Sequence, residues 1–420
     1  MKDLKSSLIL YAVTDRYWLN GKKLKDDVEK AILGGATMIQ LREKDLPIDE
    51  FIKEAFEIKE ICKKYDVPFI INDSLDVFLA VDADGIHVGQ NDMPANIVRK
   101  KIGPNKILGV SAETVEEALL AEKMGADYLG VGTIFNTSTK LDAISVSLDT
   151  LAQISYSVNI PVVAIGGINI NNIKELKNTM ISGISVVSAI FAESDIIGKT
   201  KLLKEEVNKL FFNPNNYKNF IVDYDGTLLK SLKMWETIAS RYIISKGLVP
   251  EDDLDLIVKL QTNDETAKYM SEKYFNNIDP KIIINDIDSF IEKEYLDIKI
   301  WNNAKSFLDK LKNGNVVLYT ATSLSLIEKS LKINDISNYF KKLYTSTNFD
   351  YTKSDGSGYI RLINIESFDV KDTLIIEDAT HALLGAKSKG LNVLGIATYK
   401  NMRDIEKIRK SCDFLIKMED

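Results

Sequence analysis

Short apolar runs alternate with longer amphipathic stretches over the first half of the chain. Each run is rich in β-branched residues, and the stretch that follows it repeats its apolar positions at helical spacing. The predicted strands begin at Leu8, Thr37, Pro68, Gly85, Lys106, Tyr128, Pro161 and Ile184. Eight strand-then-helix units within roughly 200 residues favour a closed (β/α)8 barrel over an open doubly wound sheet. Polar residues and glycines gather where these runs end, which is where barrels build their active sites.

This alternation stops at FFNPNNYKN, a segment that begins at Phe211. Pro214 among asparagines cannot continue a helix, so we predict a barrel over 1–212 and a linker over 213–218. A second domain would then cover 219–420. Its first strand is followed by a helical region over about 231–313, and further strand runs begin at Val316, Lys341, Asp372 and Asn392. This order predicts a doubly wound, Rossmann-like α/β domain that carries a helical cap.

Composition narrows the class of protein. A chain of 420 residues is too long for one ordinary core, and its formal charge of −7 argues against a general nucleic-acid binder. No segment approaches the roughly 20 apolar residues of a membrane helix. Cys62 and Cys412 show no disulfide or metal-binding spacing, and a chain whose only histidines are His87 and His381 has almost no means of building a histidine metal site. We therefore expect a cytoplasmic enzyme with small phosphorylated substrates and no nucleic-acid or membrane partner; a homo-oligomer remains open.

Charged and amide side chains follow the second, third and fourth predicted strands. Gln40, Arg42 and Lys44 alternate along one strand, so they share a face and form an anion clamp. Asp73 follows Asn72 at the end of the next strand, and Asp92 lies in the loop after the fourth. Two carboxylates at neighbouring strand ends suit Mg²⁺, which takes few protein ligands together with phosphate oxygens.

A second set of phosphate-binding groups follows the later strands. The sixth strand leads into Thr137, Ser138, Thr139 and Lys140. Gly166–Gly167 and Val187–Ser188 come after the seventh and eighth strands, at the usual phosphate site of barrels. The predicted pocket therefore holds two anionic groups, one of them with a metal ion.

The motifs QLREK, INDSLDVFLAVDADGIHVGQNDMP, GVSAETVEEA, GADYLGVGTIFNTSTK, VVAIGGI and VVSAIF occur in this order. Together they resemble thiamine-phosphate synthase, a transferase that joins hydroxymethylpyrimidine diphosphate to thiazole phosphate and releases pyrophosphate. The resemblance implies that the diphosphate is held by Gln40, Arg42, Lys44, Asn72 and Lys140. It implies that Asp73 and Asp92 bind Mg²⁺. It also implies that Ser111 is a catalytic residue that contacts the pyrimidine-side substrate. For the thiazole phosphate it implies Thr137, Thr139, Gly167, Val187 and Ser188.

Two features qualify this resemblance. Thr133 stands where a proline is expected in a GxGP turn, a change that removes no charged group. A thiazole tautomerase is the rival interpretation and would imply an acid–base histidine later in the barrel. No histidine occurs between His87 and His381, so the sequence favours the synthase.

The second domain opens with FIVDYDGTLLKS, in which an apolar strand leads to Asp223 and Asp225. Such a pair can divide the work, one carboxylate attacking and the other transferring protons. The motif resembles the haloacid dehalogenase superfamily of phosphatases. That resemblance implies an aspartyl-phosphate on Asp223 and protonation of the leaving alcohol by Asp225.

Later motifs extend this second resemblance. Thr320 would hydrogen-bond the phosphoryl group, and Lys353, preferred over Lys341 and Lys342, would neutralise its charge. Asp378, in the pair Glu377–Asp378, would complete a second Mg²⁺ site with Asp223 and the Asp225 carbonyl. Trp235 and Trp301 are expected to be buried rather than to stack on a substrate ring.

The sequence thus predicts a bifunctional enzyme of thiamine biosynthesis, with a synthase barrel and a phosphatase that hydrolyses a small phosphomonoester. Thiamine phosphate is one candidate substrate of the phosphatase. Two alternatives remain open for the second domain: a general phosphatase for sugar or nucleotide phosphates, and a non-catalytic module that binds thiamine phosphates. Binding alone needs no nucleophile, so the presence of Asp223 and Asp225 favours catalysis.

Overall fold

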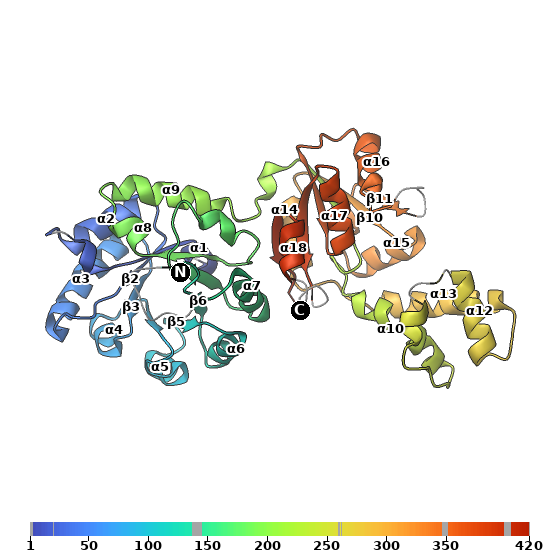
Figure 1. Cartoon of the computed structure of the whole chain (residues 1–420), viewed down its shortest axis with the longest axis horizontal. Helices are drawn as coiled ribbons and strands as arrows, with labels where there is room; N and C mark the ends of the chain where they lie inside the picture. The colour runs from blue at the N-terminus through green and yellow to red at the C-terminus, as the bar shows by residue number, and fades with distance from the viewer. Residues whose placement is uncertain are drawn as a thin grey trace. The chain divides into compact units, whose positions relative to one another are not determined.

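The computed structural model describes residues 3–19, 21–136, 145–258, 261, 263–346, 352–398 and 405–419. Contacts divide the chain into two compact units, the first mostly Met1–Phe212 and the second mostly Asn213–Tyr399. Each unit has its own sheet, and both sheets are built from strands that alternate with helices (Figure 1). Within the described part of the chain, no helix has both the length and the apolar character needed to span a membrane.

The first unit is a closed barrel of eight parallel strands, as predicted. The strands are β1 Leu10–Val13, β2 Met38–Leu41, β3 Phe69–Asn72, β4 Gly85–Val88, β5 Ile107–Ala112, β6 Tyr128–Val131, β7 Val162–Ile165 and β8 Gly183–Val186. Closure comes from β1, which pairs with both β2 and β8. All four residues of most of these strands are buried, because the barrel interior covers one face and helices cover the other.

Helices surround the barrel strands in Figure 1. They are α2 Leu24–Leu33, α3 Ile48–Lys64, α4 Leu75–Val81, α5 Ala95–Ile102, α6 Val115–Lys123, α7 Leu148–Ser157, α8 Ser188–Phe191 and α9 Ile196–Asn208. Two features differ from the sequence prediction. A short helix, α1 Leu4–Ser7, precedes β1, and the run predicted as the eighth strand ends at Val186 and continues as α8. Because VVSAIF is apolar almost throughout, its hydrophobic pattern does not distinguish a strand from a helix.

The second unit contains a six-stranded sheet in the order β11-β10-β9-β12-β13-β14. Its strands are β9 Asn219–Val222, β10 Asn315–Thr320, β11 Lys342–Thr345, β12 Thr373–Glu377, β13 Asn392–Ala397 and β14 Phe414–Lys417. The first strand, β9, pairs in parallel with both β10 and β12. The carboxyl ends of β9, β10 and β12 therefore lie side by side. The strand β14 was not predicted.

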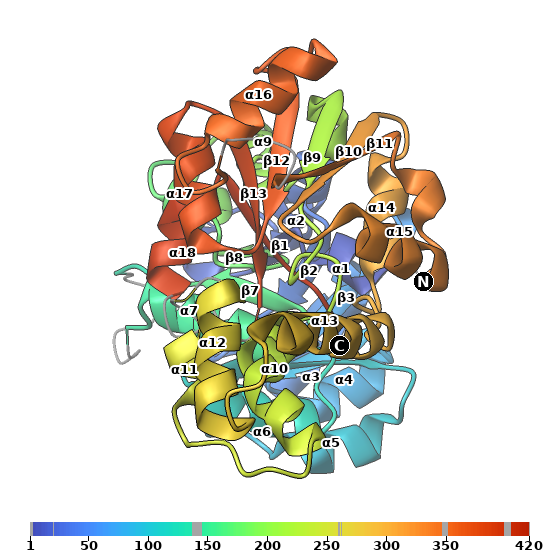
Figure 2. The ribbon, with the colours of Figure 1, turned by 90° about the vertical axis from the view of Figure 1, so that its right-hand side faces the viewer.

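Four helices between β9 and β10 form a cap with its own small apolar core. They are α10 Leu232–Ser245, α11 Leu254–Val258, α12 Asn263–Tyr274 and α13 Pro280–Leu296. Tyr242, Met270 and Ile283 lie in that core, and the helices form a separate group in yellow tones in Figures 1 and 2. The chain leaves and re-enters the sheet region through an antiparallel bridge between Leu229 and Ile300. Helix α14, Ala304–Leu311, then leads to β10.

Candidate active sites

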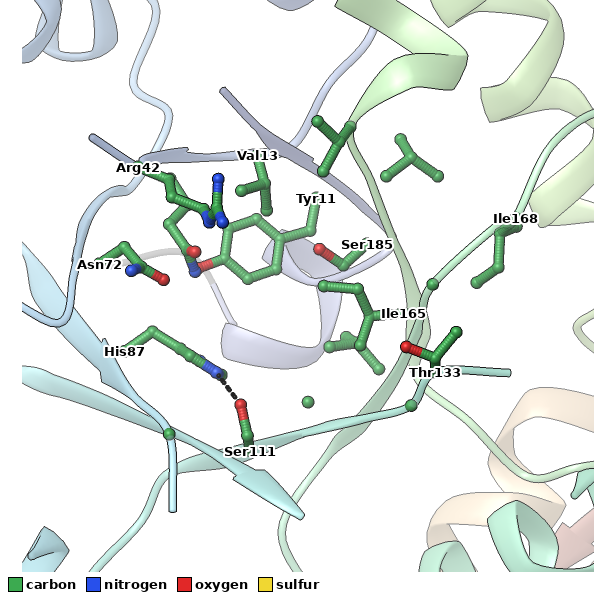
Figure 3. A pocket seen from close by; sticks show the side chains of 18 of the residues that line it. Tyr11, Val13, Arg42, Asn72, His87, Ser111, Thr133, Ile165, Ile168 and Ser185 are labelled. Atoms are coloured by element: carbon green, nitrogen blue, oxygen red, sulfur yellow. Dashed lines mark hydrogen bonds between the residues drawn. The ribbon is translucent and has the colours of Figure 1, made fainter. Parts of the chain in front are cut away.

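A cavity of about 220 Å³ opens among the carboxyl ends of the barrel strands (Figure 3). All the predicted barrel residues that the structure describes line it: Gln40, Arg42, Lys44, Asn72, Asp73, Asp92, Ser111, Gly167, Val187 and Ser188. Thr137, Thr139 and Lys140 lie outside the described residues. The alternation of side chains along each strand explains why residues from so many separate segments meet in one cavity.

Two acidic residues of the cavity, Asp73 and Asp92, face each other. Asp73 adopts a left-handed backbone conformation, with φ of 59°, and its N–H donates to the carbonyl of His87 at 2.9 Å. The pKa of Asp73 is raised to about 6 by partial burial, by a hydrogen bond with Asp92 and by the Asp92 charge, against smaller opposite effects of a hydrogen bond with Asn72 and of the Arg42 charge. Two carboxylates that repel each other in this way fit a divalent cation, which would relieve the repulsion.

Gly167 has a positive φ of 63° that few other residues adopt. A Cβ at this position would lie 2.5 Å from the carbonyl oxygens of Phe135 and Asn136. The side-chain amides of Asn169 and Asn172 donate to the Gly167 carbonyl at 3.1 and 2.9 Å. The loop after β7 is thereby fixed with its backbone exposed to the cavity.

Sequence reasoning missed a buried polar network in the barrel. Tyr11 and Tyr128 are 1% and 0% exposed, and their hydroxyls lie 2.8 Å apart. His87 lies between Tyr128 and Ser111, and its bond to Ser111 is drawn in Figure 3. Burial lowers the pKa of His87 to about 4, with a smaller opposite effect from Asp92, so the ring is neutral at pH 7. Gly109 lies against both Tyr128 and His87, but a glycine within a strand does not identify the side chains that it faces, so the sequence did not indicate this network.

In the second unit, Lys353 lies between two buried carboxylates. Its ammonium is hydrogen-bonded to Asp223, and it lies 3.1 Å from an oxygen of Glu377. Burial opposes the Lys353 charge, but the two carboxylates outweigh it and raise the Lys353 pKa. The rivals lie elsewhere: Lys341 bonds to Asn315, and Lys342 pairs with Glu366 at the surface.

Asp223, Glu377 and Asp378 form a buried acidic cluster at the ends of β9 and β12. One oxygen from each lies within 4.8 Å of the others. The pKa of Asp223 is raised to about 7 by burial and then by the Glu377 charge, with a smaller opposite effect of Lys353. Burial, and then the charges of Glu377 and Asp223, raise the pKa of Asp378, against a smaller opposite effect of Lys353. Three buried carboxylates with one ammonium leave excess negative charge, which fits a divalent cation.

Gly226 allows the chain to pass close to this cluster. Its φ is +84°, and a Cβ there would lie 2.4 Å from a carboxylate oxygen of Asp378. Any other residue at this position would be strained and would displace Asp378.

Asp225 is turned away from the acidic cluster and accepts hydrogen bonds on both carboxylate oxygens. Oδ1 accepts hydrogen bonds from the Ser231 hydroxyl at 2.6 Å and from the indole N–H of Trp235 at 3.2 Å. Oδ2 accepts hydrogen bonds from three hydroxyls, those of Thr322 at 2.7 Å, Tyr295 at 3.1 Å and Thr320 at 3.4 Å. The sequence had pointed to Thr320 alone among these donors, because the others come from the cap and from loops whose approach to Asp225 follows only from the fold.

The two tryptophans behave differently. Trp301 is 7% exposed and donates to the Gly226 carbonyl at 3.2 Å, as expected of a buried aromatic. Trp235 is 37% exposed, so its predicted burial was wrong. Its hydrogen bond to Asp225 keeps it at the rim of the site, with part of the ring in solvent.

Comparison with known proteins divides the chain in the same way. Residues 10–190 match the family model of thiamine monophosphate synthase, and residues 220–396 match that of haloacid dehalogenase-like hydrolases. A thiamine-phosphate synthase of Clostridium tetani is 58% identical over 187 residues, which cover 44% of this chain and 90% of that protein. One from Ruminiclostridium cellulolyticum is 56% identical over 201 residues, covering 48% of this chain and 96% of that protein.

Solved structures resemble each half separately. A thiamine phosphate pyrophosphorylase from Pyrococcus furiosus is 42% identical and covers 50% of this chain and all of its own length, with a TM-score of 0.47. A putative β-phosphoglucomutase from Thermotoga maritima is 17% identical and covers 48% of this chain and 94% of its own, with a TM-score of 0.41.

Proposed function

Because the chain belongs to the thiamine-phosphate synthase family through its barrel, we propose that the barrel joins hydroxymethylpyrimidine diphosphate to thiazole phosphate and releases pyrophosphate. The observation that carries this proposal is the near full-length match to curated synthases. A single cavity lined by cations, acids and a glycine loop supports it.

The cavity residues suit a reaction in which a diphosphate leaves a ring-stabilised carbon. Such a reaction needs no strong protein nucleophile; it needs neutralisation of the leaving charge and alignment of the thiazole nitrogen. In this proposal the diphosphate is held by Gln40, Arg42, Lys44, Asn72 and Lys140. The thiazole phosphate is held by Thr137, Thr139, Gly167, Val187 and Ser188. Asp73 and Asp92 would hold Mg²⁺, which supplies further charge neutralisation when bound.

For the second unit, a haloacid dehalogenase-like hydrolase domain, we propose hydrolysis of a small phosphomonoester. An oxygen of Asp223 attacks phosphorus and the bond to the leaving alcohol breaks, while Asp225 donates a proton to that alcohol. Water then attacks phosphorus, Asp225 takes its proton, and phosphate leaves Asp223. The position of Lys353 beside Asp223 supports this assignment. Thr320 would contact the phosphoryl group, and Asp223, Asp378 and the Asp225 carbonyl would hold Mg²⁺, which balances phosphate charge when bound.

Thiamine phosphate is the candidate substrate of this phosphatase, because fusion keeps it close to its source. A general sugar or nucleotide phosphatase and a non-catalytic thiamine-phosphate-binding module are the alternatives. The presence of Asp225 two residues after the proposed nucleophile Asp223 favours catalysis, since a binding module needs no proton-transferring carboxyl group there.

One incubation tests both proposals. The purified protein is mixed with hydroxymethylpyrimidine diphosphate, thiazole phosphate and Mg²⁺, and the thiamine species are separated by chromatography. If the wild type yields free thiamine and the Asp223→Asn variant yields thiamine phosphate instead, both activities in one pathway would be supported. Thiamine phosphate that persists with the wild type would support the synthase and exclude thiamine phosphate as the phosphatase substrate. The absence of any product would overturn the synthase proposal.

A further inference from the structure

A continuous chain of side-chain hydrogen bonds crosses the barrel and begins and ends at the cavity. The Gln40 amide donates to the Tyr11 hydroxyl at 2.6 Å, and Tyr11 lies 2.8 Å from the Tyr128 hydroxyl. Tyr128 lies 3.0 Å from Nδ1 of His87, whose Nε2 lies 3.0 Å from the Ser111 hydroxyl. Gln40 and Ser111 line the cavity. Figure 3 shows Tyr11, His87 and Ser111 around it.

The orientation of the Gln40 amide, with its nitrogen toward the Tyr11 hydroxyl, sets the direction in which every other member donates. A hydroxyl has one hydrogen to give, and Tyr11 accepts from Gln40. If Tyr11 also accepted from Tyr128, its own buried hydrogen would lack a partner among the residues that the structure describes, at the cost of a lost hydrogen bond. Tyr11 therefore donates to Tyr128, and Tyr128 donates to Nδ1 of His87.

The direction at Nδ1 fixes the tautomer of His87. A ring nitrogen that accepts a hydrogen bond carries no hydrogen, so the single proton of the neutral ring is on Nε2. Nε2 then donates to the Ser111 oxygen, and the Ser111 hydrogen is left for another acceptor. The Ser111 carbonyl is occupied separately by the Gln90 amide at 2.5 Å, which holds the backbone of this residue.

Two glycines make room for the bond between Tyr128 and His87. A Cβ at Gly109 would lie 2.3 Å from the Tyr128 hydroxyl and 2.4 Å from Nδ1 of His87. A Cβ at Gly130 would lie 3.1 Å from Cε1 of the same ring. Any side chain at Gly109 would therefore clash with both partners of this bond. The absence of a side chain there leaves the space in which Tyr128 and His87 meet.

We propose that Tyr128 is a positioning residue of the synthase: through the Nε2–H tautomer of His87 it directs the Ser111 hydroxyl hydrogen toward an acceptor atom of the pyrimidine-side substrate. This inference rests on the proposed function of the barrel. Tyr128 is fully buried, whereas the residues lining the cavity include Tyr11, His87 and Ser111, so Tyr128 acts through its neighbours.

The tautomer can be read directly in the wild-type protein. The chain has two histidines, and His381 is exposed on helix α17, Thr380–Ser388. Two-dimensional ¹H–¹⁵N spectra of protein labelled at histidine, with His381→Gln to assign the signals, distinguish the two ring nitrogens. We expect His87 as the Nε2–H tautomer. The Nδ1–H tautomer would overturn the inference even if the protein makes thiamine phosphate.

A hydroxyl deletion tests the consequence for turnover. We expect Tyr128→Phe to lower kcat/KM of synthesis by about 10- to 100-fold, mainly in kcat, and to mix the His87 tautomers. Tyr65→Phe is the matched control, because it removes a hydroxyl bonded to Glu29 outside the cavity. Unchanged kcat/KM in a folded Tyr128→Phe protein would overturn the positioning role. If that variant fails to fold, the wild-type tautomer decides. A barrel with the Nε2–H tautomer but no synthesis would instead refute the proposed function.

Discussion

The indole N–H of Trp235 donates a hydrogen bond to Oδ1 of Asp225, with 3.2 Å between the two atoms. Trp235 belongs to the first cap helix, and Asp225 follows the central strand of the sheet. Tyr295, in the last cap helix, bonds to the other carboxylate oxygen. The proposed proton donor is thus held by the first and the last helix of the cap, so the position of these two helices sets the orientation of its carboxyl group.

We expect Trp235→Phe to lower kcat of phosphomonoester hydrolysis by up to about 10-fold, because it removes a hydrogen bond that positions the Asp225 carboxyl group and a hydrogen bond contributes about 0.5–1.5 kcal/mol. The ring is kept, so packing against Tyr295 changes little. Steady-state kinetics on the substrate identified by the incubation above would measure the effect. Trp18→Phe in the barrel is the control. Equal kcat in both variants would show that the indole hydrogen bond has no catalytic role.

Replacing Lys353 by methionine should reduce hydrolysis by roughly 100- to 1,000-fold, since it removes the charge beside the nucleophile. The variant also leaves Asp223 and Glu377 buried without their ammonium partner, so its unfolding temperature should fall. Lys341→Met is the control, because Lys341 bonds to Asn315 instead. A normal rate of hydrolysis in Lys353→Met would show that Lys353 does not supply the charge that the reaction needs.

The raised pKa of Asp223 predicts a pH dependence of stability when Mg²⁺ is removed. The pKa rises from 3.8 to about 7, mainly through burial, so the folded state holds this proton more tightly than the unfolded state. The resulting stability is complete below the unfolded pKa and is lost as pH rises through about 7. Relative to wild type, Asp223→Asn should therefore gain unfolding free energy between about pH 4 and about pH 7, by up to about 1.4 kcal/mol per pH unit.

Urea unfolding in a chelator at several pH values would measure this difference. Asp355→Asn is a suitable control, because hydrogen bonds from Ser357 lower the pKa of Asp355 to about 2 and it is ionised throughout this range. A difference between wild type and Asp223→Asn that does not change with pH would contradict the prediction.

In the barrel, Arg42→Ala and Asp92→Ala should each cost about 2–4 kcal/mol of transition-state stabilisation. Both residues line the cavity, and the reaction leaves charge on the departing diphosphate. Synthase assays with the hydrolase assay run in parallel would measure this, and hydrolysis should be unaffected. Lys64→Ala, which removes a surface pair with Glu29, is the control. Near-normal synthesis in both site variants would overturn the site assignment.

Much of the architecture could be read from the sequence because parallel strands buried on both faces appear as continuous apolar runs. Asp223 and Asp225 stood out for the same reason, since they interrupt such a run. The strand β14 did not, because Phe414–Lys417 is short and ends in a charged residue. Tyr11 and Tyr128 could not be paired from sequence, since strands β1 and β6 are not neighbours and meet only across a closed barrel.

The central place of β9 also governs when each site can form during synthesis of the chain. Asp223 is made first, but Lys353 follows 130 residues later and the sheet is completed only after that. Contacts between such distant segments form slowly, because the intervening loop must be ordered first. The barrel, whose strands all precede β9, can close on the ribosome while the second unit is still being translated. A newly made chain would then gain its first active site before its second.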